Sequence, residues 1–298
     1  MNRLHFSGLI AAVCALILCP ANGQAGVLYT YNGTTQGLTL VGNANTASTS
    51  DGTVLRITPG LIGQSGAVYS TTAVPLGTGG TFSTQFQFRF TGQGGIDPAD
   101  GIVFVLATNT TGLGQAGGGL GYQGTNGNSV GIEFDTYENG GADSSSNHVA
   151  IDTNGVLTDT ALVNVYGIAH CDFDNGYTEP GCMSNGDLWT VNISYNGTNL
   201  TVTLSDPREG TTFTALNNYP INIASILGQN TAYVGFSAST GSGFENHDIV
   251  TWTFANTVQI SGVPTVPALS RWALGMVTVL LVVIAFLMFR RKDTSPAV

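Results

Sequence analysis

The sequence predicts an all-β protein in which two antiparallel sheets pack face to face as a sandwich. Only 9% of the 298 residues are charged and Gly occupies 41 positions. Thr, Asn and Ser are also abundant, and this composition is typical of short strands joined by turns. Over residues 27–258, short alternations of apolar and polar residues follow one another without a helical period longer than two turns. Because no βαβ spacing separates these stretches, we expect antiparallel pairing.

The first 25 residues predict a secretory signal peptide. Arg3 precedes an apolar stretch over residues 9–18, and small residues follow up to Ala25. This order of a basic start, an apolar segment and small residues is typical of a cleaved export signal. We therefore expect the mature chain to be exported.

The C-terminal part predicts a spacer over residues 259–271 and a transmembrane helix over residues 272–292. Residues 272–289 carry no charge, and at about 1.5 Å per residue they span about 27 Å, close to the thickness of a bilayer core. The basic cluster that follows, residues 290–292, should remain cytoplasmic. The simplest interpretation is a membrane anchor.

The same segment resembles a known class of sorting signal. The run Val263-Pro264-Thr265, the later Trp272 and the basic end resemble the Ile-Pro-Thr-Leu (IPTL) type of C-terminal signal of Gram-negative bacteria. This resemblance implies a location in the cell envelope or on the outer surface. It also implies a partner, an exosortase-type transpeptidase, that would cut near the motif and release the helix.

The central part of the chain is strongly acidic. Between residues 27 and 258 there are three arginines and no lysine, against seventeen carboxylates. A surface of this charge repels phosphate backbones, so nucleic-acid binding is excluded.

Two cysteines remain after removal of the signal peptide, Cys171 and Cys182. Exported proteins mature in an oxidising compartment, where such a pair forms a disulfide. We expect this bond to close a surface loop.

Several stretches show the alternation of individual strands. Over residues 81–90, aromatic and small residues alternate with polar ones, which predicts a strand with one buried face. Asn196-Gly197 separates two further stretches and is typical of a tight hairpin turn. Trp189 and Trp252 are expected in the core. The other predicted strands cover residues 188–195, 200–204, 232–237 and 249–254.

The stretch 130–137 combines a strand pattern with acidic residues. Its apolar face carries Val130, Ile132 and Phe134, and its other face carries Glu133 and Asp135. The Cα atoms of these two acids should lie about 7 Å apart. Carboxylates on one side of a strand repel one another unless a positive group lies between them. They can ligate metal ions jointly, or they can belong to an acidic turn whose side chains cap the backbone.

The residues that follow favour the metal interpretation. Asn139, Asp143 and His148 add an amide, a third carboxylate and an imidazole. Carboxylates with an imidazole suit a Mn²⁺-like ion, whereas carboxylates with an amide oxygen and a backbone carbonyl suit Ca²⁺. Two cations that share two of the carboxylates would neutralise the cluster. His170 and His247 are expected to be hydrogen-bonded surface or edge residues instead.

These residues carry a resemblance to the legume-type (L-type) lectins. The run 131–139, with Asp143 and the segment 147–152 after it, resembles the metal loop of that family. The resemblance implies a concanavalin-like jelly-roll sandwich over residues 26–258, with carbohydrate binding and no catalysis. Further matching segments occur in family order at residues 38–44, 67–70, 82–86, 99–104, 119–121, 233–241 and 252–254.

The resemblance also implies two metal ions. One is a transition-metal ion such as Mn²⁺, and the other is Ca²⁺. Their ligands would be Glu133, Asp135, Asp143 and His148 for the transition metal, and Asp135, Asp143, Asn139 and the carbonyl of Tyr137 for calcium.

A set of sugar-binding residues follows from the same resemblance. Asp100, after a cis peptide bond, and Asn139 would bind sugar hydroxyls. Tyr137 would stack on the apolar side of a pyranose, and Gly118 or Gly119 would offer a backbone N–H. Loss of metal would then abolish sugar binding.

Two other functions compete with this interpretation. Glu133, Asp135 and Glu138 also fit the acidic signature of a glycoside hydrolase family with a jelly-roll fold. In that case Glu133 would be the nucleophile and Glu138 the general acid/base, which requires a bulge to bring both onto one face. The other alternative is a metal-stabilised adhesin or spacer that binds no sugar.

The expected partners are glycans or an exopolysaccharide. Recognition by a few hydrogen bonds and one aromatic stack gives weak affinity at a single site. Useful binding would then need several sites, as in a homo-oligomer.

Overall fold

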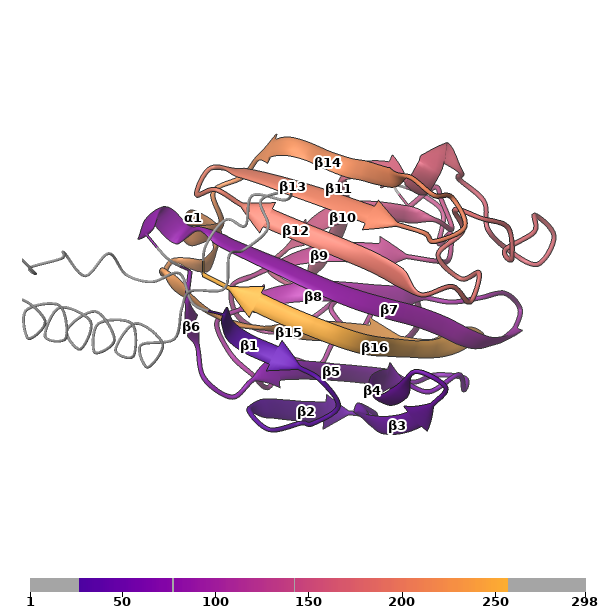
Figure 1. Cartoon of the computed structure of the whole chain (residues 1–298), viewed down its shortest axis with the longest axis horizontal. Helices are drawn as coiled ribbons and strands as arrows, with labels where there is room; N and C mark the ends of the chain where they lie inside the picture. The colour runs from indigo at the N-terminus through magenta and orange to yellow at the C-terminus, as the bar shows by residue number, and fades with distance from the viewer. Residues whose placement is uncertain (1–26, 77, 142, 257–298) are drawn as a thin grey trace, which may run out of the picture. The chain divides into compact units, whose positions relative to one another are not determined.

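The computed structural model describes residues 27–76, 78–141 and 143–256. These residues form two antiparallel sheets that lie one in front of the other, as Figure 1 shows. The all-β sandwich prediction is therefore confirmed. The predicted signal peptide, spacer and transmembrane helix lie outside the described residues. Within those residues, no helix has the length and apolar character needed to cross a bilayer.

The front sheet is ordered by pairing between strands that are distant in the sequence. Its strand β16 (Gly243–Ala255) also pairs with a further strand, β1 (Val27–Tyr31). In spatial order the sheet contains β14 (Thr212–Pro220), β13 (Asn199–Ser205), β12 (Trp189–Tyr195), β7 (Phe82–Gly95), β16 (Gly243–Ala255), β4 (Gly52–Thr58) and β3 (Asn45–Thr49).

The back sheet carries the predicted site. Its strand β15 (Thr231–Ser239) also pairs with a short strand, β6 (Val74–Pro75). The helix α1 (Ile223–Leu227) precedes β15 in the chain. In spatial order the sheet contains β11 (Val156–Asn164), β10 (His148–Thr153), β9 (Ser129–Asp135), β8 (Gly101–Ala107), β15 (Thr231–Ser239), β5 (Ser65–Ser70) and β2 (Leu38–Gly42).

The individually predicted strands are all present, with different ends. Of the predicted range 81–90, residues 82–90 fall in β7, and residues 249–254 fall in β16. Both strands are longer than predicted because they pair with each other along most of their length. The hairpin around Asn196-Gly197 joins β12 to β13. The strand predicted over residues 130–137 ends at Asp135, where the chain turns into the candidate metal loop. The predicted disulfide between Cys171 and Cys182 is present.

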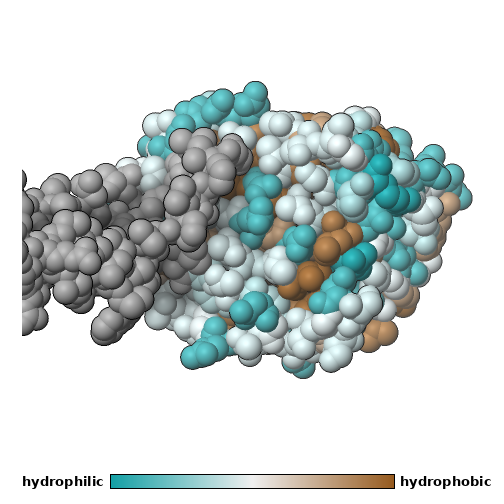
Figure 2. All heavy atoms as spheres, viewed as in Figure 1, coloured by the Kyte–Doolittle hydropathy of each residue, from teal (hydrophilic) through white to brown (hydrophobic). Residues whose placement is uncertain are grey.

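The core between the sheets is built on the aromatic face of β7. Phe86 is fully buried, and its ring packs against those of Phe104, Phe134 and Phe236 in the back sheet, with centroids 4.9 to 6.2 Å apart. Gln85 is exposed on the other face of β7. Figure 2 shows that this outer face is mostly polar or neutral, with small hydrophobic patches. The alternation in the sequence therefore separates core from solvent.

A second apolar cluster lies on the outer face of the back sheet. Val103 and Val105 of β8 pack there against Leu120 and Tyr122 from the segment that joins β8 to β9. Val103 is the register partner of Glu133 in β9, so both side chains leave the same face of the sheet. This covered outer face is where the acidic residues of the site are found.

We expect Phe86→Ala to lower the free energy of unfolding by about 3–5 kcal/mol, because it leaves a cavity lined by the rings of Phe104, Phe134 and Phe236. Gln85→Ala, its exposed neighbour, should change the free energy of unfolding by less than about 0.5 kcal/mol. Urea denaturation followed by tryptophan fluorescence measures both. Equal effects of the two substitutions would contradict this assignment of the core.

Candidate functional site

Three neighbouring strands of the back sheet bring the predicted metal ligands together. In the register of β8, β9 and β10, Asp135 lies between Gly101 on one side and His148 on the other. Phe134 enters the core between the sheets. Because side chains alternate across a strand, Glu133 and Asp135 both leave the outer face.

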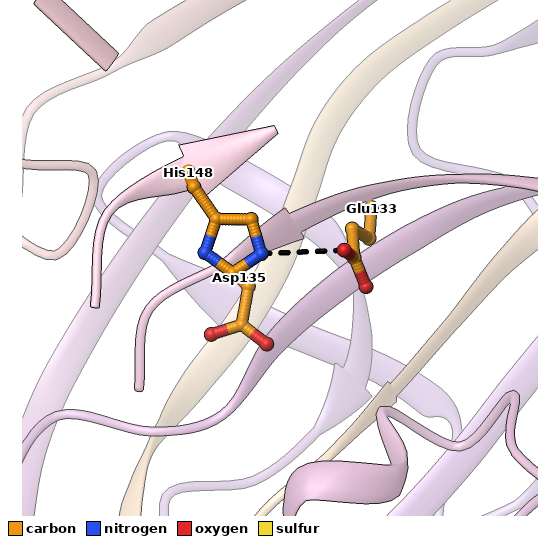
Figure 3. Close-up of side chains that lie close together, drawn as sticks. All are labelled: Glu133, Asp135 and His148. Atoms are coloured by element: carbon orange, nitrogen blue, oxygen red, sulfur yellow. Dashed lines mark hydrogen bonds and ion pairs between the residues drawn. The ribbon is translucent and has the colours of Figure 1, made fainter. Parts of the chain in front are cut away.

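Glu133, Asp135 and His148 form a compact donor triad. Their exposed fractions are 1%, 3% and 0%, and each offers a ligand atom within 4.8 Å of the other two. Figure 3 shows the imidazole of His148 facing the carboxylate of Glu133, with Asp135 beside both. Two carboxylates and an imidazole at this spacing fit a single transition-metal ion.

The protonation state of His148 strengthens this fit. Its Nδ1 lies 2.8 Å from the carbonyl oxygen of Ser145, which can only accept a hydrogen bond, so Nδ1 carries the proton. Nε2 then directs its lone pair at Glu133 Oε1, 3.2 Å away. Two acceptors at this distance repel unless a proton or a cation lies between them. Burial lowers the pKa of His148 and raises that of Glu133, so without metal the proton between them belongs to the Glu133 carboxyl, and a bound cation would take its place.

Asp143 lies beside the triad and not within it. Its Oδ1 is 3.8 Å from Nδ1 of His148, the nitrogen that does not face Glu133. Its Oδ2 accepts the N–H of Asn139 at 2.7 Å. The structure therefore brings three of the four expected transition-metal ligands together, and Asp143 would have to rotate toward the metal to become the fourth.

The loop after β9 carries the oxygen donors expected for calcium. The N–H of Tyr137 donates to Asp135 Oδ1 at 2.7 Å, and Gly140 pairs with Asp143 in an isolated bridge. These contacts fold the loop back so that the carboxylate of Asp143 and the exposed Asn139 lie near the end of β9. Carboxylate and amide oxygens are the ligands that Ca²⁺ prefers.

A cavity of about 460 Å³ opens at this point. Glu133, Asp135 and Asp143 line it together with Asn139 and Gly118. A Cβ at Gly118 would collide with the carboxamide of Asn139, whereas a Cβ at Gly119 would meet Gln115. Of the two glycines left open by the sequence, Gly118 is therefore the one that contacts Asn139.

Asp100 is joined to the same region by backbone hydrogen bonds. The Ala99–Asp100 peptide bond is cis, as the resemblance implies. The carbonyl of Asp100 accepts the N–H of Thr136 at 2.9 Å, immediately after the end of β9. The Asp100 side chain is 3% exposed, and a Cβ at Gly241 would lie 3.6 Å from its Oδ2.

The carboxylates around the cavity have no basic partner. Among buried side-chain atoms of residues 27–76, 78–141 and 143–256 that lack a hydrogen bond, the carboxylate oxygens belong to Asp100, Asp143 and Asp152. Each arginine of this part of the chain pairs with an aspartate outside the cavity. These pairs are Arg56 with Asp248, Arg89 with Asp51, and Arg208 with Asp187.

The pKa values of these carboxyl groups reflect the absence of a positively charged partner. Burial is the largest cause that raises the pKa of Asp100 to about 7 and that of Asp143 to about 6. Burial also raises the pKa of Glu133, followed by the charge of Asp152, and the pKa of Asp135, followed by the charge of Asp143. A divalent cation would stabilise the ionised forms of all four groups.

Asp152 and Asp159 lie beside Glu133, and the sequence had given them no role. Each of the three carboxylates has an oxygen within 4.8 Å of the others. Asp159 has a φ of 46°, at a point where the register between β10 and β11 shifts. Its N–H and that of Thr158 donate to Asp152 Oδ1 at 3.3 and 2.6 Å. No sequence pattern indicates the left-handed backbone at Asp159. Only its carboxylate could have suggested that this residue belongs to the site.

Glu245 and His247 of β16 form a buried network behind the site that sequence reasoning also missed. Glu245 accepts hydrogen bonds from Thr136 Oγ1 at 2.8 Å and from Ser184 Oγ at 3.0 Å. His247 Nε2 accepts the N–H of Gly101 at 3.1 Å. His247 is hydrogen-bonded as expected, but it is fully buried, so the expected surface or edge position is wrong. This hydrogen bond fixes the backbone of Gly101, the residue that follows Asp100.

Glu138, the second residue of the hydrolase alternative, lies in different surroundings from Glu133. The side chain of Glu138 is 42% exposed and pairs with His170 at 3.3 Å, whereas Glu133 is buried. The chain has left the strand at Asp135, and no bulge returns Glu138 to the face of Glu133. This geometry gives the hydrolase alternative no support.

Comparison with known proteins identifies relatives of the whole domain. A family model described as legume lectin domain matches residues 28–269. L-type lectin-domain containing receptor kinase I.1 of Arabidopsis thaliana is 28% identical over 285 residues, which cover 89% of this chain and 41% of the relative. The lectin alpha chain of Lablab purpureus is 31% identical over 196 residues, which cover 62% of each chain. The chain thus spans less than two thirds of the length of these two relatives.

Solved structures show the same architecture. Basic winged bean lectin with Tn-antigen has a TM-score of 0.61 and 25% identity, with 76% of this chain and 96% of the lectin covered. Lectin I-B4 from Griffonia simplicifolia, in its metal-free form, has a TM-score of 0.60 and 25% identity, with 76% and 97% covered. Since the family model matches more than half of the sequence, the chain belongs to the legume lectin domain family.

Proposed function

We propose that this protein is an exported, metal-dependent lectin that binds carbohydrate without catalysis. The observation that carries the proposal is the cavity that joins the donors Glu133 and Asp135 to Asn139 and Gly118, with Asp100 tied to the end of the same strand. Its carboxylates are buried and have no basic partner. Membership in the legume lectin domain family supports the carbohydrate-binding part.

In this proposal, two cations occupy the region around the end of β9. When bound, they supply the positive charge that the buried carboxylates lack, and they orient the loop that carries Asn139. The transition-metal ligands would be Glu133, Asp135, His148 and a reoriented Asp143, and the calcium ligands would be Asp135, Asp143, Asn139 and the carbonyl of Tyr137.

The sugar would lie against the loops at the end of β9. The buried Oδ2 of Asp100 has no hydrogen-bond partner and could accept a sugar hydroxyl. The exposed amide of Asn139 could donate to another hydroxyl, and Gly118 keeps the backbone close by because it has no side chain. The half-buried ring of Tyr137 would stack against the apolar side of a pyranose.

We also propose display at the envelope of a Gram-negative bacterium, with glycans or exopolysaccharide as partners. The disulfide between Cys171 and Cys182 is in keeping with an oxidising compartment. On the sequence alone we further propose anchoring by residues 272–292, cutting by an exosortase-type enzyme and assembly into a homo-oligomer.

Glycan binding should require both metal and Asp100. We expect the full chain to bind glycans on an array in Ca²⁺ and Mn²⁺, and to lose at least about 90% of that signal in EDTA, because uncompensated carboxylates would displace the site loops. Asp100→Asn should lose the signal even with metal present, since its amide would replace an acceptor by a donor.

Glu209→Gln, in the turn between β13 and β14, is the control for removal of an acidic charge and should keep the array signal. Glycan binding that persists both in EDTA and in Asp100→Asn would overturn the proposal. Absence of binding by the unaltered chain would favour the adhesin or spacer, and glycan turnover that Glu133→Gln abolishes would favour the hydrolase.

His148 and His170 should differ in their effect on metal binding. We expect His148→Ala to weaken Mn²⁺ binding at least about tenfold, because it removes a ligand nitrogen. His170→Ala should leave Mn²⁺ affinity unchanged, because this histidine is exposed and pairs with Glu138. Isothermal titration of Mn²⁺ into EDTA-treated protein measures both, and equal losses would contradict the triad.

The stability of the metal-free protein should fall as the pH rises from about 5 to about 7.5. The raised pKa values of Asp100 and Asp143 mean that the folded state holds protons that the unfolded state has already released in this range. His148, whose pKa is lowered, opposes this trend below about pH 6.5 because only the unfolded state protonates it. It is a single group, whereas the raised pKa values of Glu133 and Asp135 act in the same direction as those of Asp100 and Asp143. Asp206, whose pKa is lowered, acts only at lower pH. Urea midpoints across the range should decline in EDTA and stay level with Mn²⁺ and Ca²⁺. A midpoint that rises with pH in EDTA would contradict the electrostatic account.

A further inference from the structure

The disulfide-closed segment 171–182 is clamped to the chain just before His148. Ser145 Oγ donates to the carbonyl of Ala169 at 2.9 Å, and the N–H of Cys171 donates to Ser146 Oγ at 2.8 Å. The buried amide of Asn147 donates to the carbonyl of Gly181 at 2.9 Å and accepts the N–H of Met183 at 3.0 Å. Both ends of the segment are therefore fixed to residues 145–147, beside the donor triad.

The same segment contacts the loop that leads to Asp100. The N–H of Phe173 donates to Asp97 Oδ1 at 2.8 Å, three residues before Asp100. Phe173 is thus held beside the loop that leads to Asp100, at the edge of the proposed sugar site.

Phe173 presents an aromatic surface to solvent at this edge. Its side chain is 42% exposed, and that of Ile96, beside Asp97, is 55% exposed. Among the large hydrophobic residues exposed in the described parts of the chain, Phe173 alone is aromatic. Tyr177 packs edge-to-face against it, with ring centroids 5.3 Å apart, and this contact fixes the orientation of the ring. A fixed, exposed aromatic ring suits the apolar face of a pyranose.

The charge of the segment selects among saccharides. Asp172, Asp174 and Glu179 lie within it. The one arginine that contacts the segment in the described residues, Arg208 through the carbonyl of Thr178, is already paired with Asp187, so the surface stays acidic. An acidic surface repels uronate or sulfated sugars. The surface therefore suits a neutral saccharide.

We propose that the segment 171–182 forms a second saccharide subsite beside the Asp100 site, with Phe173 as its stacking surface. The inference rests on the proposed lectin function and adds a preference for neutral oligosaccharides over monosaccharides. The first sugar residue contacts Asp100 and Asn139, and the next residue of the same chain contacts Phe173. Continuity with the first site makes the next sugar residue the occupant of this surface.

The test compares sugars of increasing length on the full chain with Ca²⁺ and Mn²⁺ present. The ligands are glucose, mannose, galactose and N-acetylglucosamine, each with its homo-disaccharide and homo-trisaccharide. We expect Phe173→Ala to weaken oligosaccharide binding about three- to tenfold, the range of one aromatic stacking contact. Monosaccharide affinity should stay within about twofold. Phe173→Tyr should retain the oligosaccharide affinity because it keeps the ring.

Val156→Ala is the matched control for an exposed apolar residue, because Val156 lies at the turn of the β10–β11 hairpin, at the opposite end from His148. It should change neither affinity. Circular dichroism would verify that each variant is folded.

The outcomes separate this inference from the proposed function. If Asp100→Asn abolishes binding of every sugar while Phe173→Ala leaves the ratio of oligosaccharide to monosaccharide affinity unchanged, the subsite is overturned and the lectin function stands. A Phe173→Ala variant that weakens both classes equally also overturns the subsite. Binding that survives Asp100→Asn overturns the lectin site itself, and failure of the unaltered chain to bind any of these sugars overturns both.

Discussion

Glu133 and Asp135 leave the outer face of the back sheet and are buried there beneath the segment that joins β8 to β9. Removing a carboxylate from water costs several kcal/mol unless a partner replaces the lost hydration. The arginines of the domain are engaged elsewhere, and the lone pair of His148 faces Glu133 without adding positive charge. The burial is therefore sustained by protons or by cations. The candidate sugar groups are attached to this cluster, so their positions depend on how it is neutralised.

The front sheet also contributes to the position of these groups. Glu245 and His247 belong to β16 of the front sheet. Glu245 nevertheless accepts a hydrogen bond from Thr136, just after the end of β9, and His247 accepts the N–H of Gly101, the first residue of β8. Thr136 in turn donates to the carbonyl of Asp100. A continuous set of hydrogen bonds thus links a front-sheet strand to both loops of the site. These hydrogen bonds explain why two buried positions of β16 carry the polar residues Glu245 and His247.

The parts of the structure that depend on local spacing could be predicted. Alternation along β7 placed Phe86 in the core, and the spacing of Glu133, Asp135 and His148 placed them together because adjacent antiparallel strands carry them. Asp159 could not be predicted, because its place depends on a left-handed residue at a register shift. The network around His247 depends on contact between the two sheets, which strand alternation does not specify. The choice of Gly118 over Gly119 likewise depends on the path of a folded loop.

This difference bears on which parts of the site could vary in sequence. The donor triad is fixed by the register of β9 and β10, so a one-residue slip would turn Glu133 and Asp135 into the core. The segment 171–182 is held instead by residues 145–147, by Asp97, by Asp206 and Arg208 in the turn after β13, and by its own disulfide. None of the hydrogen bonds that hold the segment joins one of its exposed side chains, such as that of Phe173, to the donor triad. Substitutions there could therefore change which saccharide is preferred without disturbing the metal ligands.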